Sequence, residues 1–312
     1  MNLKESLRRF QRAMARYALY FFFWLFSKLS YESVIGMTDG MFGCAYPLLI
    51  RQKKIAEKSL KIAFRRGKTQ AEIEDIMRRC FRNLGQGMVE MLYFLSHPQV
   101  AHEKISFEGR EHLDFALAQG NGVVAVTAHF GNFPLMMLAC ALEGYKTNSI
   151  IRPMRDLKVE EFFQRKRTES GLNTVYAVPR RECVNNSLKA LRNNEILFIP
   201  LDQNFGSDGG VYVDFFGQKA ATATGPVVFA KRTKALILPM FIIREPNDHH
   251  KIIIEPPLTM EDGKDEEETI LNNTARITKI IEQYIRRYPY EWGWMHRRWK
   301  SRPYFSRYLP NA

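Results

Sequence analysis

Short apolar runs alternate with helical stretches through most of the chain after residue 120, and this alternation constrains the fold more than any other feature. The first run, Val123–Thr127, shows no apolar–polar alternation, as expected of a strand buried on both faces. Similar runs lie at 147–151, 173–177, 196–201, 236–243 and 252–254, and helical stretches lie at 132–143, 156–170, 184–193 and 225–234. This order predicts an α/β fold with a mainly parallel central sheet flanked by helices.

Helices are also predicted before and after this region. Residues 54–64 have an amphipathic pattern. Thr69 and Glu72 form a T-x-x-E capping box that opens a second helix, which reaches about Leu95. A last helix at about 266–288 begins with acidic residues, which suit the partial positive charge of a helix N-terminus.

The first fifty residues combine basic charge with aromatic side chains. An apolar run of about ten residues, 17–26, contains Phe-Phe-Phe-Trp and follows a basic segment. A helix that spans a membrane needs roughly twenty apolar residues. A second apolar stretch, 37–50, is interrupted by Asp39. We therefore expect a helix lying in the cytoplasmic leaflet or a shallow re-entrant hairpin, and an ordinary buried core helix is the alternative.

The net charge points to an anionic partner. The chain carries 46 Lys and Arg residues against 33 Asp and Glu residues, which gives +13. A membrane, an acidic carrier protein and nucleic acid are the three candidates. The sequence has no zinc-finger spacing, Gly-rich RNA-binding motif or recognisable helix-turn-helix, so no nucleic-acid partner is predicted. The four cysteines are scattered singly and no cleavable signal peptide is evident, so we expect a reduced, cytoplasm-facing protein without a metal site.

Polar residues follow several of the predicted strands. His129 follows the first run, and Asp202 follows the run that ends at residue 201. The other polar residues in such positions are Arg152, Arg155, Arg180 and Arg181. Ligands of open α/β sheets bind beyond the carboxyl ends of the strands. If the strands are parallel neighbours, one edge is expected to hold a base, its orienting partner and a phosphate clamp made by Arg152 and Arg155.

Each of these residues has an ordinary explanation when it is considered alone. A single histidine is more often structural than catalytic, an aspartate after a strand is often a cap, and an arginine is often a plain surface charge. Together they predict that His129 is a general base, kept neutral by a helix N-terminus, and that Asp202 holds its tautomer. Backbone N–H groups near Gly131 and Asn132 are expected to bind the substrate by stabilising an oxyanion.

Six blocks of sequence occur in order along the chain. They are the segment 53–64, from Lys-Lys-Ile-Ala to Ala-Phe, Ala-His-Phe-Gly-Asn-Phe at 128–133, Leu-Asp-Gln-Asn at 201–204, Val-Tyr-Val-Asp-Phe-Phe-Gly at 211–217, Ala-Thr-Ala-Thr-Gly-Pro at 221–226 and Glu-Trp-Gly-Trp-Met-His-Arg-Arg-Trp-Lys at 291–300. These blocks resemble the bacterial lipid A biosynthesis lauroyl/myristoyl acyltransferases. The resemblance covers nearly the whole chain. It implies a membrane-associating N-terminal helical segment over 1–50 and an α/β acyltransferase domain over 51–312.

The resemblance also implies an activity and a location. A fatty acyl group would move from a thioester of acyl carrier protein or coenzyme A to a hydroxyl group of a lipid A-type or related membrane lipid. The thioester is a co-substrate, and no other cofactor is expected. The protein would lie at the cytoplasmic face of the cell inner membrane as a peripheral or monotopic protein.

One residue departs from the family pattern. The family places Asp or Glu at the fifth position after the histidine, where this chain has Pro134. Asp202 becomes the candidate acid, since related mannosyl-lipid acyltransferases also pair the histidine with an acid from this later block. An active enzyme is favoured, and a catalytically inactive lipid-binding protein of the same fold is the alternative. The sequence lacks the G-x-S-x-G motif that a serine hydrolase of this fold class needs.

Several further residues have weaker expectations. Phe215 and Phe216 are expected to line an acyl groove or to belong to the core. The basic residues at 165–167 and 297–300 are expected to dock a carrier protein or lipid headgroups, with a solvated face as the alternative. His296 lies in the last block and is a possible contributor to the site.

Overall fold

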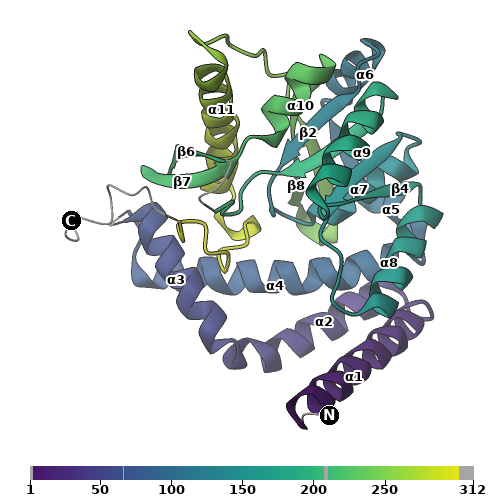
Figure 1. The fold of residues 1–312 in the computed structure, drawn as a ribbon. Coiled ribbons are helices and arrows are strands. Elements are labelled where there is room, and N and C mark those ends of the chain that lie inside the picture. The colour runs from purple at the N-terminus through teal and green to yellow at the C-terminus, as the bar shows by residue number, and fades with distance from the viewer. Residues whose placement is uncertain (1–2, 66, 207–209, 302–312) are drawn as a thin grey trace.

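A computed structural model describes residues 3–65, 67–206 and 210–301. Within these residues, seven strands form one sheet in the order β1-β9-β8-β2-β5-β3-β4, and every neighbouring pair is parallel except β8 with β9. The strands are β1 (Ile105–Glu108), β2 (Val123–Thr127), β3 (Thr147–Ile151), β4 (Leu172–Tyr176), β5 (Ile196–Pro200), β8 (Leu236–Arg244) and β9 (His250–Ile254). The predicted α/β fold with a mainly parallel sheet is confirmed (Figure 1).

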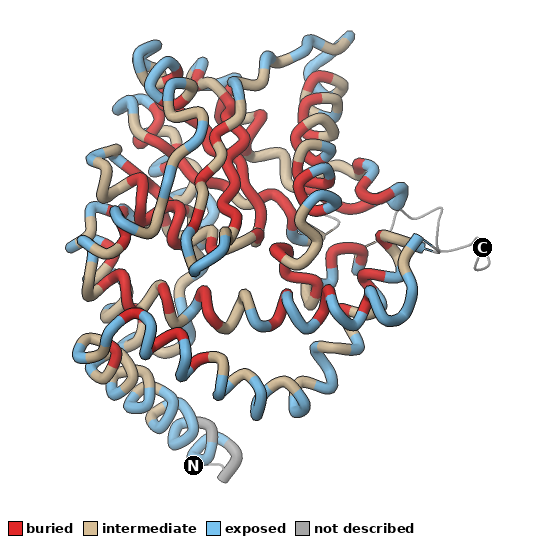
Figure 2. The backbone as a smooth tube through the Cα atoms, turned by 180° about the vertical axis from the view of Figure 1, so that it is seen from behind, coloured by how far each residue is buried: buried red, intermediate tan, exposed pale blue. Residues whose placement is uncertain are grey.

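Helices cover both faces of the sheet. The helices of the described residues are α1 (Leu3–Phe26), α2 (Tyr31–Ala45), α3 (Ile50–Phe64), α4 (Gln70–Phe94), α5 (Pro98–Lys104), α6 (Arg110–Ala118), α7 (Phe133–Leu142), α8 (Leu157–Glu169), α9 (Arg180–Arg192), α10 (Gly225–Thr233) and α11 (Glu266–Arg287). Val124 and Val126 of β2 pack in one core with residues of α10 and α11. Val123 and Ala125 pack in the other core with residues of α7. Burial on both faces explains the continuous apolar sequence of this strand, which lies at the buried centre of the molecule (Figure 2).

The structure contains strands that the periodicity does not predict. β1 has only four residues and pairs with β9, which lies far away in the sequence. β6 (Gly210–Phe215) and β7 (Gln218–Ala223) form a separate antiparallel hairpin, which packs against α11. Because β1 pairs with a strand that is distant in the sequence, its own four residues carry little signal.

The N-terminal helices pack beneath the sheet (Figure 1). α1 is longer than the predicted apolar run because the basic residues before that run continue the same helix. α2 packs against α4, whose capping box is present as predicted. Among the described residues, no single helix is long and apolar enough to cross a membrane, whereas Tyr31–Leu48 and Ile50–Phe64, bent by 83° at their junction, meet those criteria as a pair.

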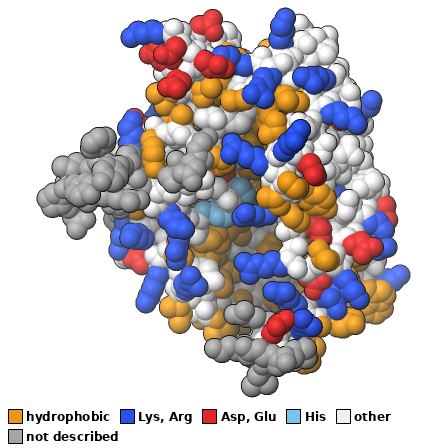
Figure 3. Space-filling model, viewed as in Figure 1, with side chains coloured by type: hydrophobic (Ala, Val, Ile, Leu, Met, Phe, Trp, Pro, Cys, Tyr) orange, Lys and Arg blue, Asp and Glu red, His pale blue; other side chains and the backbone are white. Residues whose placement is uncertain are grey.

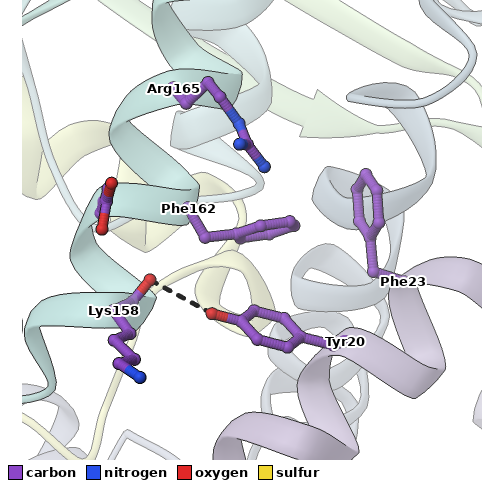
Figure 4. A pocket seen from close by; sticks show the side chains of 6 residues that line it. Tyr20, Phe23, Lys158, Phe162 and Arg165 are labelled. Atoms are coloured by element: carbon purple, nitrogen blue, oxygen red, sulfur yellow. Dashed lines mark hydrogen bonds between the residues drawn. The ribbon is translucent and has the colours of Figure 1, made fainter.

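α1 is attached to the rest of the molecule through α8. The hydroxyl group of Tyr20 donates a hydrogen bond of 3.2 Å to the carbonyl oxygen of Lys158 (Figure 4). The ring of Phe162 packs between α1 and α8, with its centroid 5.3 Å from that of Tyr20 and 5.0 Å from that of Phe23. A surface cavity of about 430 Å³ opens at this junction, and Lys158 and Arg165 line it. The N-terminal segment therefore contacts the α/β region directly.

Candidate active site

His129 and Asp202 meet at the carboxyl edge of two neighbouring strands. β2 and β5 are parallel partners, with Thr127 opposite Pro200, so the residues just beyond both strands lie side by side. The Nδ1 atom of His129 lies 2.8 Å from Oδ1 of Asp202. The backbone N–H of His129 donates to the same oxygen at 3.0 Å. The structure thus brings together the two residues that the sheet topology predicts to be neighbours.

Asp202 is held as a buried carboxylate. Its exposed fraction is 1%, and its second oxygen accepts a hydrogen bond of 2.7 Å from Nε1 of Trp292. Burial acts to raise the pKa of Asp202, but the charge of His129 and the hydrogen bonds from His129 and Trp292 together lower it well below its usual range. The carboxylate is therefore ionised at neutral pH.

The imidazole of His129 is oriented by this carboxylate. Burial acts to lower the pKa of His129, but the charge of Asp202 and the hydrogen bond to it raise that pKa above the ordinary value. The prediction that a helix N-terminus lowers it is wrong in net effect, because Asp202 touches the ring whereas α7 begins only at Phe133. The amide nitrogen of Gln203 lies 2.9 Å from Nε2 of His129, on the far side of the ring from Asp202.

Gly131 shapes the loop that carries His129. Its φ of +56° is in the left-handed region, and a Cβ atom there would lie 2.1 Å from the carbonyl oxygen of Ile242. Its N–H donates to the carbonyl oxygen of Glu291 at 2.8 Å. The prediction that this N–H stabilises an oxyanion is therefore wrong, because the donor is already used within the protein.

Asn132 is also used within the protein. Its Oδ1 caps α7 by accepting from the N–H of Leu135 at 3.3 Å. Its Nδ2 donates to Glu90 at 3.0 Å and to the carbonyl oxygen of Gly87 at 3.2 Å. The side chain of Asn132 thus fixes the loop against α4, and the role of its backbone N–H in binding an oxyanion stays a prediction.

A buried ionic network centred on Glu90 supports this loop, and no pattern in the sequence predicts it. Glu90 lies in α4 with an exposed fraction of 0%. Arg244 donates to both of its oxygens at 2.7 Å, and the hydroxyl group of Tyr31 donates at 2.8 Å. Burial acts to raise the pKa of Glu90, but His250 and Arg244 lower it well below its usual range. A glutamate within an amphipathic helix carries no sequence signal for such a role.

The predicted phosphate-binding arginines lie farther along the sheet. β3 neighbours β5 rather than β2, so Arg152 shares the carboxyl edge with His129 but lies one strand beyond Asp202. Its side chain is exposed. Arg155 lies beside α1, where it lines a surface depression with Arg12. Arg180 and Arg181 begin α9 after the edge strand β4 and are exposed.

Two of the predicted docking arginines are buried instead. Arg298 is inaccessible and donates to the carbonyl oxygens of Gln203 at 3.1 Å and Ala221 at 2.5 Å. Burial lowers the pKa of Arg298 to about 10. Arg167 pairs with Glu160 at 2.7 Å, and both side chains are 8% exposed. Neither residue is able to contact a partner, so the docking expectation is wrong for these two positions.

The aromatic residues near the C-terminus of the described chain form core. Phe215 and Phe216 are buried and pack against Trp292, Trp294 and Trp299, so they do not line a groove. By contrast, His296 lies beside the base, with ring centroids 5.1 Å apart, and burial lowers its pKa. Histidine side chains are visible at the bottom of a hollow that has Lys and Arg side chains around it (Figure 3).

An apolar pocket of about 370 Å³ lies beside the His129 loop. Gly131, Asn132, Phe133 and Pro134 form one wall. The opposite walls come from α1, α2, α4 and α8, through Leu19, Phe22, Phe26, Met41, Asn83, Leu84, Gly87, Met88, Val89, Met91, Leu92 and Phe163. Pro134 therefore faces an apolar pocket at the position where the family pattern places an acid.

Comparisons with known proteins identify the family of the chain. The family described as bacterial lipid A biosynthesis acyltransferase matches residues 1–301. A lipid A biosynthesis palmitoleoyltransferase of Escherichia coli (strain K12) is 27% identical over 290 residues, which cover 90% of this chain and 89% of that protein. A lipid A biosynthesis lauroyltransferase of the same strain is 26% identical over 286 residues, with the same shares covered. A phosphatidylinositol mannoside acyltransferase of Mycobacterium tuberculosis (strain ATCC 25618 / H37Rv) is 30% identical over 153 residues, 46% of this chain and 47% of that one. The chain belongs to the bacterial lipid A biosynthesis acyltransferase family and is an acyl-transferring enzyme.

Proposed function

We propose that this enzyme moves a fatty acyl group from an acyl carrier protein or coenzyme A thioester to a hydroxyl group of a lipid A-type lipid, with His129 as general base. The observation that carries the proposal is the 2.8 Å contact between His129 and the buried, ionised Asp202 at the carboxyl edge of the sheet. A neutral imidazole whose Nδ1–H faces a carboxylate has its Nε2 lone pair available to take a proton.

The reaction follows from that arrangement. Nε2 of His129 takes the proton of the acceptor hydroxyl group while its oxygen attacks the thioester carbonyl carbon. The resulting imidazolium is stabilised by Asp202. When the tetrahedral intermediate collapses, the carbon–sulfur bond breaks, and the thiolate leaves and recovers the proton from His129. Transfer is direct, so no acyl-enzyme forms.

The apolar pocket beside the His129 loop is suited to an acyl chain. It adjoins the base through Gly131 and Pro134, and its other walls are almost entirely apolar. Burial of each methylene group in such a pocket contributes about 0.8 kcal/mol. Phe133 lies in the same wall, and its ring centroid is 4.8 Å from that of His129. An acyl chain in this pocket would therefore have its thioester end near the base.

α1 supports an association with the cytoplasmic face of the inner membrane. Its exposed apolar side chains recur every three or four residues and form one stripe, and each is between 53% and 64% exposed: Leu7, Phe10, Met14, Tyr17, Phe21 and Trp24. Basic residues flank this stripe, as in helices that lie in an anionic leaflet. Arg152 is retained as a ligand for a lipid phosphate, and Arg155 with Arg12 provides a second basic site next to α1.

An acyl-transfer assay tests the proposal. Detergent-solubilised wild type, His129→Ala and Asp202→Asn are given radiolabelled acyl carrier protein or acyl-coenzyme A thioester and total bacterial lipid. The wild type is expected to label a lipid. Loss of a general base lowers the rate by roughly 10²–10⁴-fold, so His129→Ala should be nearly inactive. Activity above about a tenth of wild type in His129→Ala would refute its role as base.

Pro134 gives one alternative a specific basis. Because the family's acid is replaced by an apolar residue that lines the pocket, the same fold is compatible with a lipid-binding protein that has lost catalysis. That alternative predicts that the wild type transfers nothing from either thioester while still binding lipid. The buried charge of Asp202 beside His129 favours the active enzyme, since an ionised carboxylate is unfavourable in a core without a cationic or hydrogen-bonding partner.

A further inference from the structure

We infer that Gln203 is a second catalytic residue, whose side-chain amide donates a hydrogen bond to the oxyanion that forms when the acceptor hydroxyl group attacks the thioester. This inference rests on the acyl transfer proposed above. Gln203 directly follows Asp202 in the block Leu-Asp-Gln-Asn.

The oxyanion needs a donor, and the N–H of Gly131 is already used within the protein. An anionic tetrahedral intermediate in a site of low polarity requires preorganised hydrogen-bond donors. The N–H of Gly131 is donated to Glu291, and the side-chain amide of Asn132 is donated to Glu90 and Gly87. A polar side chain that already touches the base is therefore the next donor to consider.

Gln203 places an amide at the reacting atom. Its Nε2 lies 2.9 Å from Nε2 of His129, and the side chain is exposed. Because Nδ1 of His129 carries its proton toward Asp202, the Nε2 atom is an acceptor, so Gln203 must present its NH₂ group to it. In the resting enzyme, Gln203 thus occupies the place that the acceptor hydroxyl group needs.

Substrate binding moves this amide only a short way. The hydroxyl oxygen must come within hydrogen-bond distance of Nε2, and it therefore displaces the amide. The carbonyl carbon under attack lies about 3–3.5 Å from that oxygen in a reactive complex. A displacement of about one hydrogen-bond length leaves the NH₂ group next to the carbonyl oxygen, where the negative charge develops.

The backbone of Gln203 is fixed although its side chain is exposed. The buried Arg298 donates to its carbonyl oxygen at 3.1 Å. On one side, the N–H of Leu201 donates to Thr127 at 2.9 Å. On the other, Asn204 exchanges two hydrogen bonds with Ser301, at 3.0 and 3.1 Å. Such anchoring keeps the amide within reach of the base, as a preorganised donor requires.

In the step itself, the hydroxyl proton passes to Nε2 of His129, the oxygen–carbon bond forms, and the carbonyl π electrons move to the oxygen. The amide of Gln203 donates to that oxygen. The electrons then return, the carbon–sulfur bond breaks, and the thiolate takes the proton from His129. Gln203 gains and loses no proton.

The test compares Gln203→Ala and the isosteric Gln203→Glu with wild type over a range of pH, using radiolabelled acyl carrier protein thioester and total bacterial lipid. Loss of one oxyanion donor lowers kcat by about 10²–10³-fold, so Gln203→Ala should show that loss with little change in KM. The loss should persist on the alkaline side, where His129 is neutral. Gln203→Glu should be at least as slow, and its acid limb should move to higher pH because the new carboxylate stabilises the imidazolium.

Four results would overturn the inference. Full recovery of Gln203→Ala at alkaline pH means that the amide only tunes the base. If Gln203→Ala has the wild-type rate and His296→Ala loses most of its activity, His296 rather than Gln203 is the hydrogen-bond donor to the oxyanion. If His129→Ala is inactive and both Gln203 variants match wild type, the inference fails while the proposed function stands, whereas an inactive wild type removes both. Because the Gln203 side chain is exposed, thermal denaturation should show that both variants fold like wild type.

Discussion

The indole Nε1 of Trp292 donates a 2.7 Å hydrogen bond to the oxygen of Asp202 that His129 does not use. The two residues are ninety positions apart, and both are almost completely buried. One carboxylate therefore binds the base through Oδ1 and the core of the protein through Oδ2. Trp292 therefore helps to fix the rotamer of Asp202. Through Asp202 it also fixes the orientation of His129, although it forms no hydrogen bond with His129 itself.

Replacing that indole tests the dependence. Trp292→Phe removes a hydrogen bond to a charged group, which should destabilise the protein by about 1.5–3 kcal/mol. It should also lower kcat by roughly tenfold, because a poorly oriented imidazole that raises the activation free energy by about 1.4 kcal/mol slows the reaction that much. Urea unfolding and the acyl-transfer assay measure the two effects. Trp294→Phe is the matched control, since that buried indole donates to the carbonyl oxygen of Pro289. Equal kcat values in the two variants would contradict the role of Trp292.

The ionisation of His129 predicts a pH profile. Asp202 raises the pKa of His129, and only the neutral imidazole accepts a proton, so kcat/KM should rise with pH through a midpoint above the ordinary value of about 6.5. Asp202→Asn removes the carboxylate charge, so the midpoint should move to lower pH while the plateau falls. The exposed Asp262→Asn is the control and should leave the midpoint unchanged. An unchanged midpoint in Asp202→Asn would show that Asp202 does not set this pKa.

The sequence predicts the sheet and the pairing of His129 with Asp202 for the same physical reason. A strand buried on both faces has a continuous apolar sequence, and the edge where ligands bind follows from strand direction. The order of the strands is not encoded in that pattern. Arg152 follows a correctly predicted strand, yet β3 lies on the far side of β5 from β2, which only the three-dimensional packing determines.

The supporting contacts of the site are harder to predict. Trp292 reaches Asp202, and Glu90 reaches Asn132, across ninety and forty-two positions in the sequence. No periodicity links residues at such separations. Arg298 shows the opposite error, because a run of basic residues resembles a solvated face, yet this guanidinium is buried and binds backbone carbonyl groups. A buried charge with several acceptors is recognised only when its partners are in place.

The buried network around Glu90 predicts a large effect on stability. Glu90→Gln keeps the shape of the side chain but leaves the buried Arg244 with only its 3.1 Å pair to Asp248, and breaking a buried pair typically costs about 3–5 kcal/mol. The free energy of unfolding in urea measures the loss. Glu5→Gln breaks an exposed pair with Arg9 and should have no measurable effect. A loss below about 1 kcal/mol in Glu90→Gln would show that the network is not needed for stability.

Substitutions at two glycines with positive φ distinguish the cost of backbone strain from the cost of a steric clash. Gly131 and Gly120 have φ values of +56° and +76°, but a Cβ atom would lie 2.1 Å from Ile242 at the first and meets nothing within 4 Å at the second. Gly120→Ala should cost only the backbone strain, about 1–2 kcal/mol. Gly131→Ala should cost more and should also lower kcat, because the loop that carries His129 has to shift. Unfolding and activity measurements on both variants test this, and equal losses would contradict it.

Pro134 provides the sharpest test of which acid serves the base. If Asp202 holds His129, a carboxylate restored at position 134 gains no contact with the imidazole, because that position lines the apolar pocket instead. Pro134→Asp should therefore fail to raise kcat. It should raise KM for long-chain thioesters, since an ionised carboxylate in an apolar pocket is unfavourable and opposes the acyl chain. Pro134→Ala is the control for loss of the ring, and its KM should change less. A tenfold rise in kcat for Pro134→Asp would show that the site lacks an effective acid and that Asp202 does not supply it.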